Sequence, residues 1–392
     1  MDADVTAEFR AWLDANWSAG LTVREWWRRL ADSGWSFPQW PEEAGGRGES
    51  PRMARVARTE LANRKLIGPP DGIAVTMLAP TLLQHASPAQ QRELLPQIAR
   101  GEIAACQLFS EPGAGSDLAG LRTSARPDGG DWVVNGQKVW SSLAHEADWG
   151  MLLARTDPEA PKHRGISYLL VPLAQPGVEV RPLRQMNGLT EFNEVFLTEA
   201  RVPGDRLVGQ LNDGWRVAQA TLAAERSRVP SAVPAPPAGQ RGGWLDRTVG
   251  EAAEALRTAA STATRMYSRS GRAARRLALQ YDVWSDDVVR DNVVQLHILS
   301  EASRALMARL RASPFDGGAS VAKLAAAALA RRARDVDLDV LGPAGLLSGP
   351  DAALGGEVEL MALSAHLVSI GGGTDEIQKN VLAERVLGLP RE

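Results

Sequence analysis

The sequence changes character at one stretch of small residues, CQLFSEPGAGSDL at positions 106–118. The run Gly113-Ala114-Gly115 does not begin a dinucleotide fingerprint, because Leu118 stands where that pattern needs glycine and no strand–helix unit follows. Pro-Gly and Gly-Ser pairs are also common in plain turns. A dense row of small residues nevertheless exposes backbone N–H groups and lets a flat polar ligand approach the main chain. A plain turn and a ligand-binding loop are therefore both open for this stretch.

The residues before this stretch predict helices. Apolar residues recur at three- and four-residue spacing in three segments, at 8–17, 24–33 and 50–66. Ser87 followed by Pro88 is typical of a helix start, and we expect that helix to stop near Gly101. Six of the 12 tryptophans lie between Trp12 and Trp40. Large rings at helical spacing indicate a packed helical core rather than an aromatic substrate cage.

A block of about a hundred strand-like residues follows position 103. We interpret Trp132 to Trp140 as a hairpin, because Asn135-Gly136 suits a type I′ turn. Further apolar runs punctuated by prolines predict strands at 151–154, 166–171, 178–180 and 195–197.

Helical patterns return from Gly214 and break once, at the Pro- and Gly-rich residues 229–243, which we expect to form an extended loop. Helices are predicted at about 245–282, 286–312, 319–341, 357–369 and 374–387. The sequence therefore predicts an α+β protein with three domains: 1–103 helical, 104–208 β and 209–392 helical.

Composition excludes several classes of function. The net charge of −3, from 44 basic and 47 acidic residues, gives no reason to expect a nucleic-acid surface. Cys106 is the only cysteine, so no disulfide forms within the chain. The acidic start argues against a secretory signal, and no apolar run reaches the roughly 20 residues of a membrane span. The five histidines show no metal-ligand spacing. We expect a cytoplasmic protein without a metal site.

Several motifs, in this order, resemble those of the acyl-CoA dehydrogenases, flavoenzymes that oxidise acyl-CoA thioesters to enoyl-CoA. They cover nearly the whole chain and comprise PEEAGG at 41–46, SEPGAGSD at 110–117, NGQKVW at 135–140, NEVF at 193–196, RVP at 201–203, GGTDEIQ at 372–378, ER at 384–385 and LGLP at 387–390. The resemblance implies a central β-barrel-like domain between N-terminal helices and a C-terminal four-helix bundle. It also implies FAD as the cofactor.

The same resemblance assigns cofactor-binding roles. It implies that Ser110 and the backbone around Gln107 and Phe109 contact the pyrimidine edge of the flavin. Trp140 would lie against the isoalloxazine ring, and Ser142 would bond near its reactive N5. From the residues alone, an ordinary aromatic of a strand core is the commoner role for Trp140, and it is the resemblance that favours the cofactor role.

The remaining carried-over roles fall at two other motifs. Ser116 would touch the CoA part of the substrate as well as the cofactor site. Thr374 and Glu376 of the C-terminal motif are further cofactor-binding candidates.

The reaction needs a carboxylate that takes the α-proton of the thioester. In much of the family this base is a glutamate two residues before the Thr of the C-terminal motif, where this chain has Gly372. A second family position, a Glu-Arg pair on the first long helix after the β domain, corresponds to Glu225 and Arg226. An isolated Glu-Arg pair is usually a solvated face. The apolar neighbours at 220 and 222–224 and the absent side chain at Gly372 favour Glu225 as the base.

Three other residues complete the site that the resemblance implies. The backbone N–H of Gly372 is the expected donor to the enolate oxygen. Arg226 is a substrate-binding candidate, and its charge would help to keep Glu225 ionised. Gly371 stands where a bulky residue is common, so the run 371–373 leaves room for a branched or bulky acyl group.

Two departures from the family pattern concern the flavin pyrophosphate. The usual Arg-x-x-Phe-Gly motif is absent, and either the arginines at 272, 275 and 276 replace it or they form a basic surface patch. Asp339 lies in an altered Gln-x-x-Gly-Gly segment, where an acidic residue near a phosphate is unfavourable unless it faces elsewhere.

These departures leave two alternatives to a complete dehydrogenase. One is the flavin-poor, non-catalytic subunit of a heteromeric acyl-CoA dehydrogenase, as in bacterial sterol side-chain dehydrogenases. The other is a flavin-dependent oxygenase on the same fold. The resemblance implies an acyl-CoA or acyl-carrier substrate, an electron-transfer flavoprotein as acceptor, and a homodimer, homotetramer or heterotetramer.

Overall fold

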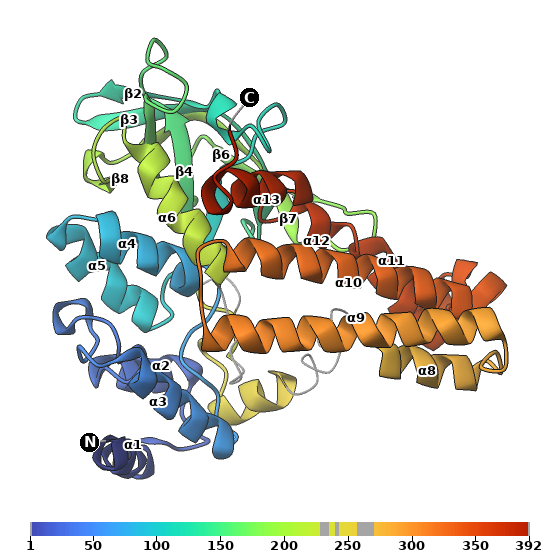
Figure 1. The fold of residues 1–392 in the computed structure, drawn as a ribbon. Coiled ribbons are helices and arrows are strands. Elements are labelled where there is room, and N and C mark those ends of the chain that lie inside the picture. Colours follow the sequence, from blue (N-terminus) through green and yellow to red (C-terminus); the bar gives the residue numbers. More distant parts are fainter. Residues whose placement is uncertain (1, 228–234, 240–242, 257–269, 391–392) are drawn as a thin grey trace. The chain divides into compact units, whose positions relative to one another are not determined.

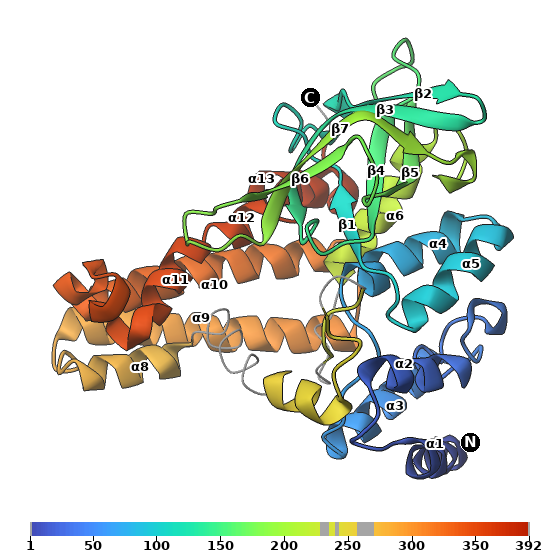
Figure 2. The ribbon, with the colours of Figure 1, turned by 180° about the vertical axis from the view of Figure 1, so that it is seen from behind.

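The structure is a computed structural model that describes residues 2–227, 235–239, 243–256 and 270–390. The chain divides into two compact units (Figures 1 and 2). Unit 1 comprises Met1–Gln185 and Thr190–Thr258, and unit 2 comprises Met186–Leu189 and Ala259–Glu392. Helices, then a sheet, then helices follow each other along the chain, which confirms the predicted α+β class. The exact bounds of the three predicted domains stay a prediction.

The N-terminal part of unit 1 is helical, as the spacing of apolar residues predicts. The helices are α1 (Asp2–Asn16), α2 (Val23–Asp32), α3 (Pro51–Asn63), α4 (Ala79–His85) and α5 (Pro88–Ala99), with a short 3-10 turn η1 (Glu42–Ala44) and a π-helix η2 (Ala74–Leu78). Ser87 caps α5, because its side chain accepts the backbone N–H of Gln90. Neither η2 nor α4 was predicted from the pattern of residues.

The tryptophans of this part pack in the core, as predicted. Trp26 and Trp27 are fully buried, and their indole N–H groups donate to the carbonyls of Ile67 (3.2 Å) and Gly68 (2.9 Å). Gly101 ends the segment with φ of 66°, and a Cβ there would lie 2.2 Å from the Trp27 ring. Glycine is therefore required at this helix end by both its backbone and its neighbour.

The middle of unit 1 is one eight-stranded sheet with the order β6-β7-β3-β2-β4-β5-β8, to which β1 adds by pairing in parallel with β4. The strands are β1 (Ala105–Leu108), β2 (Ser124–Asp128), β3 (Asp131–Ser142), β4 (Trp149–Arg155), β5 (Ile166–Pro172), β6 (Val178–Leu183), β7 (Phe192–Val202) and β8 (Leu207–Val208), with 3-10 turns η3 (Leu118–Gly120) and η4 (Gly204–Arg206). All four predicted strand runs fall within β4 to β7, and β1, β2 and β8 were missed.

The predicted hairpin turn at Asn135-Gly136 is wrong. Strand β3 runs without a turn through both residues, and the β2–β3 hairpin closes at Gly129-Gly130, where φ is 60° and 97°. Gly136 has an extended φ of 158° and lies so close to Thr123 that a Cβ would come within 2.3 Å of its Oγ1. Gly136 therefore serves close packing and a register shift in β3, not a turn.

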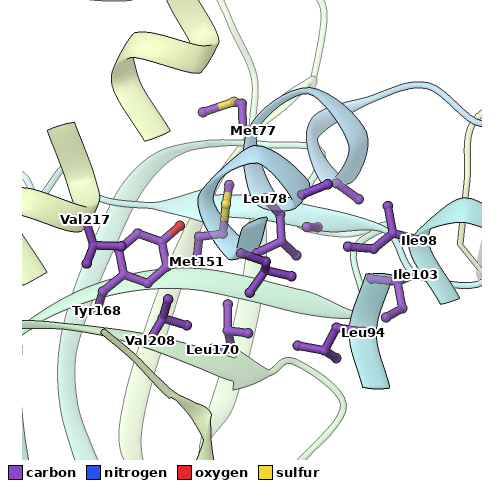
Figure 3. Packing of buried hydrophobic residues seen from close by; sticks show 14 of the residues in the cluster. Met77, Leu78, Leu94, Ile98, Ile103, Met151, Tyr168, Leu170, Val208 and Val217 are labelled. Atoms are coloured by element: carbon purple, nitrogen blue, oxygen red, sulfur yellow. The ribbon is translucent and has the colours of Figure 1, made fainter. Parts of the chain in front are cut away.

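Helix α6 (Gly214–Ser227) follows the sheet and packs against β5, α4 and η2. A continuous apolar cluster joins these elements within unit 1, and Figure 3 shows its side chains meeting from the helices and the sheet. Val217 of α6 lies beside Tyr168 of β5 in this cluster. The N-terminal part of α6 is thus fixed to the sheet by buried apolar contacts.

The described elements of unit 2 are helical. They are α8 (Gly271–Gln280), α9 (Asp287–Ala312), α10 (Gly318–Leu341), α11 (Glu357–Ser364), α12 (Leu367–Ile370) and α13 (Asp375–Val381), with 3-10 turns η5 (Gly342–Leu346), η6 (Gly349–Asp351) and η7 (Ala353–Gly356) and a π-helix η8 (Leu382–Val386). Helices α8, α9 and α10 pack together around buried alanine, leucine and valine side chains. Residues 249–256 are helical and belong to unit 1. Residues 257–269 of the predicted helix 245–282 lie outside the described residues, as do 228–234 and 240–242 of the predicted loop.

One apolar segment, Ala353–Val386, passes a length and hydropathy test for a membrane span, with a mean hydropathy of 1.3. It is divided among α11, α12, α13 and η8, with a turn at Gly371–Gly373. Each of these helices is shorter than the roughly 20 residues that a span needs.

Candidate active site

Residues 106–118 begin in the buried strand β1 and continue into a tight turn. After β1, Glu111 and Ala114 pair through both backbone groups, at 3.1 and 3.0 Å, so that Pro112 and Gly113 form the tip. A Cβ on Gly113 or Gly115 would meet nothing within 4 Å. The protein's own packing therefore does not demand glycine there, and the open space over both residues fits a ligand lying close to the main chain.

A buried ion pair ties this loop to β3. The Lys138 Nζ lies 2.9 Å from the Glu111 Oε1 and donates to the Phe109 carbonyl at 3.0 Å. Glu111 also accepts the backbone N–H groups of Arg122 (2.7 Å) and Thr123 (2.8 Å). This pair was not predicted from the sequence. The available signal was the presence of a charged residue, Glu111 or Lys138, in each of two motifs next to predicted strands.

Burial and pairing act against each other on these two groups. Burial lowers the pKa of Lys138 to about 8, although Glu111 opposes the change. Burial works to raise the pKa of Glu111, but the charge of Lys138 and the hydrogen bonds from Thr123 and Arg122 hold that pKa below its ordinary value. Glu111 is therefore a carboxylate with its acceptor capacity already used, which suits a structural role.

Trp140 owes its exposure to a bulge in β3. The register between β3 and β7 shifts between Lys138 and Ser141, and Trp140 takes a φ of 61°. Its ring is 60% exposed and meets Phe192 edge to face, with centroids 5.9 Å apart. A large aromatic residue in the left-handed region is strained, and such strain concentrates at functional sites. The exposed ring offers a flat surface to a cofactor.

The end of β3 is held by a buried amide. The Asn193 Nδ2 donates to the Ser141 carbonyl at 2.9 Å, and its Oδ1 lies 3.1 Å from the His145 Nδ1. The Ser141 Oγ is buried without a hydrogen-bond partner among the described residues, and Ser142 next to it is half-buried. An orphaned buried hydroxyl beside the exposed Trp140 ring fits a polar group bound at this strand end.

Glu225 lies on α6, one turn beyond a buried hydroxyl network. The Thr221 Oγ1 lies 2.8 Å from the Thr81 Oγ1 and 3.3 Å from the Tyr168 hydroxyl. Residues four apart share one face of a helix, so the anchored Thr221 fixes the side on which Glu225 projects. The structure brings Glu225 to β1, where the Gln107 side-chain amide donates to its carboxylate.

The pKa of Glu225 is shifted in the opposite direction from that of Glu111. Burial raises the pKa of Glu225, while the charge of Arg226 and the hydrogen bond from Gln107 act in the opposite direction. Arg226 itself is exposed. The argument that apolar neighbours bury this stretch is only partly right, because Ala223 is exposed and the neighbours at 220, 222 and 224 are half-buried. A partly buried carboxylate with a raised pKa is suited to accept a proton.

The C-terminal motif lies in unit 2. Thr374 caps α13, because its side chain accepts the Ile377 N–H at 3.3 Å. Asp375 is buried and bound by Lys323 (2.9 Å) and Arg331 (2.8 Å). Burial works to raise the pKa of Asp375, but these hydrogen bonds outweigh it and lower the pKa. The turn before α13 is thereby fixed to α10.

The three glycines of this turn differ in conformation. Gly372 and Gly373 have φ of 65° and 87°, and the Gln378 amide donates to the Gly372 carbonyl at 2.8 Å. Gly371 is extended and exposed. The predicted roles of these glycines, and of Thr374 and the exposed Glu376, stay predictions.

The candidate phosphate residues are also described within unit 2. The side chains at 272, 275 and 276 are exposed, and the Arg275 guanidinium lies 5.3 Å from the centroid of the Trp284 ring. Asp339 is exposed and accepts a long 3.4 Å hydrogen bond from Asn292. In unit 1, Ser116 is exposed at the edge of the Gly-rich turn.

Comparison with known proteins identifies the family in three consecutive matches. Residues 3–102, 106–199 and 247–387 match the family models for the acyl-CoA dehydrogenase N-terminal, middle and C-terminal domains. The chain is 38% identical to acyl-CoA dehydrogenase IpdE1 of Mycobacterium tuberculosis over 94% of this chain and 88% of that protein. It is 39% identical to acyl-CoA dehydrogenase FadE34 of the same organism over 92% of this chain and 46% of that protein.

Solved structures agree with these matches. The ChsE4-ChsE5 complex from Mycobacterium tuberculosis contains a chain with a TM-score of 0.69 and 30% identity, over 100% of this chain and 97% of that chain. The Tcur3481-Tcur3483 steroid ACAD contains one with a TM-score of 0.69 and 27% identity, over 100% and 98%. The resemblance drawn from the motifs is confirmed, and with it the predictions of an enzyme and of FAD as its cofactor.

Proposed function

The chain belongs to the acyl-CoA dehydrogenase family of FAD-dependent oxidoreductases, and we propose that it oxidises an acyl-CoA thioester to the trans-2-enoyl-CoA with Glu225 as the base. FAD, when bound, accepts the hydride that leaves the β-carbon. The observation that carries the proposal is the Glu225 carboxylate, which α6 presents beside β1 with a raised pKa and a hydrogen bond from the Gln107 amide.

The chain's own residues divide the remaining work. Glu225 takes the α-proton. Its raised pKa lies nearer to the operating pH than the pKa of an ordinary glutamate, which suits a general base. The backbone around Gln107 and Phe109 and the hydroxyl of Ser110 hold the polar edge of the cofactor, while the Trp140 ring covers its flat face. The charge of Arg226 favours the ionised form of the base.

The other site residues have binding roles in this proposal. Ser142, Thr374 and Glu376 contact the cofactor, and Ser116 contacts both the cofactor and the CoA portion. The Gly372 N–H donates to the developing enolate oxygen, and Gly371 leaves space for the acyl group.

The test is the variant Glu225→Gln, which keeps the shape of the side chain and removes the base. In the flavin-loaded assembly, we expect the variant to retain bound flavin and to lose bleaching of the flavin by substrate in an anaerobic titration. Glu194→Gln is the matched control, since Glu194 is also held by a glutamine amide, that of Gln137, at 2.9 Å. Reduction of Glu225→Gln at the wild-type rate would show that the base lies elsewhere. If replacing Glu225 abolishes an activity that is measured with artificial electron acceptors as oxidant, that result would also count against an oxygenase.

We propose that the acyl group is bulky and polycyclic. The support is the steroid ACAD among the structural neighbours and the absence of side chains at 371–373. A panel of acyl thioesters, from short linear chains to ring-bearing acids, tests this in the same titration. A strict preference for a short linear acyl-CoA would contradict it.

We further propose that the chain works in the cytoplasm, in an assembly with a second, related chain and with an electron-transfer flavoprotein as acceptor. Two structural neighbours, ChsE4-ChsE5 and Tcur3481-Tcur3483, are heteromeric complexes, and the Arg-x-x-Phe-Gly motif is absent here. A heterotetramer is favoured over a homodimer or homotetramer on these grounds. The chain purified alone would then bind little flavin and gain it with its partner, whereas a fully yellow homo-oligomer would contradict the proposal. A colourless assembly that no partner loads would identify a non-catalytic subunit.

A further inference from the structure

Gln107 is the polar residue on an otherwise apolar face of β1. Cys106 and Leu108 point to one face of the sheet and are fully buried in its cluster. Ala105 and Phe109 belong to the opposite cluster, against which α6 packs. Side chains alternate along a strand, so Gln107 shares the face of Ala105 and Phe109. An amide on that face needs a partner.

The partner is supplied by α6. The Phe109 ring meets Tyr168 edge to face at 5.9 Å, and the Tyr168 hydroxyl lies 3.3 Å from the Thr221 Oγ1. This chain of contacts sets the distance between β1 and α6 at the turn before Glu225. The Gln107 amide then donates to the Glu225 carboxylate across the gap.

A glutamate that serves as a base needs a fixed direction as well as a negative charge. Arg226 follows Glu225 directly on the helix and is exposed, so water and salt screen its charge. An N–H that donates to a carboxylate favours the ionised form and is directional. An amide has no charge of its own and does not titrate, so its help does not vary with pH.

We propose that Gln107 is the positioning residue of the base, holding the Glu225 carboxylate toward the reacting carbon through its side-chain amide. This role is separate from the contact that the backbone of Gln107 makes with the cofactor, and it rests on the proposed role of Glu225. The Gln107 side chain touches neither proton nor hydride and acts only through Glu225.

The experiment replaces the amide without changing the length of the side chain, as Gln107→Met. We expect the anaerobic rate of flavin reduction to fall about 10- to 100-fold, the effect of losing a hydrogen bond to a charged group. The acid limb of the pH profile should move upward by about one pH unit, because the ionised form loses its donor. Flavin content and KM should stay near those of the wild type, because the backbone of β1 is unchanged.

Two comparisons separate positioning from general structure. Gln137→Met is the matched control, because its amide donates to Glu194 on the same sheet, and it should leave the rate and the pH profile unchanged. The double variant Gln107→Met/Glu225→Gln should be no slower than Glu225→Gln alone, since Gln107 acts through that carboxylate.

The outcomes distinguish this inference from the proposed function. If Glu225→Gln is inactive while Gln107→Met keeps the wild-type rate and pH profile, the positioning role is wrong and the base stands. If Glu225→Gln is reduced at the wild-type rate, the base assignment itself fails. Loss of flavin from Gln107→Met would overturn the inference, because the amide would then hold the cofactor rather than the base.

Discussion

Two carboxylates flank β1 in unit 1, and burial drives the pKa of both upward, yet their net shifts are opposite. Glu111 follows the strand and receives hydrogen bonds from Lys138 and two backbone N–H groups, so its pKa falls below the ordinary value. Glu225 reaches the strand from α6, and burial raises its pKa because the Gln107 amide and the charge of the exposed Arg226 offset that burial only in part. At Glu111 the Lys138 cation and the hydrogen bonds outweigh burial, whereas at Glu225 burial outweighs the charge of Arg226 and the Gln107 amide.

The difference explains why the two residues suit different tasks. A carboxylate saturated by donors and a buried cation neither moves nor accepts a proton easily, and it fixes the loop that carries Phe109 and Ser110. A carboxylate with a raised pKa and spare lone pairs is able to take a proton from a substrate. Pairs of titratable groups whose environments separate their pKa values are typical of active sites.

The largest expected effect comes from breaking the buried pair. Lys138→Met leaves the Glu111 charge buried without its cation and should lower the free energy of unfolding by about 3–5 kcal/mol, measured by chemical denaturation. Arg201→Met is the control, because the ion pair of Arg201 with Asp128 at 2.6 Å is more than half exposed on both sides. That variant should show no measurable loss.

A second variant tests whether the loss comes from the unpaired charge. Glu111→Gln combined with Lys138→Met removes both charges and should recover part of the stability, because no buried ion remains unpaired. Equal destabilisation of the double and the single variant would mean that packing around Lys138, rather than charge, holds the loop.

The next prediction concerns opposite slopes of stability with pH. The lowered pKa of Glu111 stabilises the folded state above pH 4.5, its unfolded value, and this contribution is lost as pH falls through the folded pKa. The raised pKa of Glu225 means that the folded state holds its proton more tightly than the unfolded state, so stability falls as pH rises from 4.5 through the folded pKa.

Two glutamine variants separate these slopes. Relative to the wild type, Glu225→Gln should be equally stable below pH 4.5 and more stable above the raised pKa, although we expect it to be inactive. Glu111→Gln should be less stable at neutral pH, with the deficit shrinking in acid. Denaturant titrations at several pH values measure both, and parallel curves for the two variants would remove the distinction between the carboxylates.

The sequence could predict the order of helices and strands because each element carries its own local signal. Apolar spacing gave α1 to α3, and Ser87 with Pro88 gave the start of α5. The hairpin failed because Asn135-Gly136 carries a turn signal that is overridden by tertiary packing against Thr123, while Gly129-Gly130 takes the turn. A dipeptide cannot show which of its uses the rest of the chain enforces.

The candidate site was only partly visible in the sequence for a similar reason. Glu225 could be proposed because a family motif singles out its position, but its donor Gln107 lies 118 positions earlier and only the pairing of β1 with β4 and the packing of α6 bring them together. The Glu111–Lys138 pair was missed because each residue alone reads as a surface charge. Burial of a charge is decided by contacts between segments, which no local pattern contains.

The smallest expected effect on stability belongs to Trp140, whose ring is exposed at the bulge in β3. Since its side chain is 60% exposed, Trp140→Ala should change the free energy of unfolding by less than about 1 kcal/mol. The same variant should lose flavin, measured as the ratio of flavin to protein absorbance after dialysis, because we propose that the ring covers the flat face of the cofactor. Phe196→Ala on β7 is a control that removes a ring outside the site. If Trp140→Ala instead destabilises the fold and keeps its flavin, the strained bulge in β3 serves packing and the Trp140 ring is no cofactor surface.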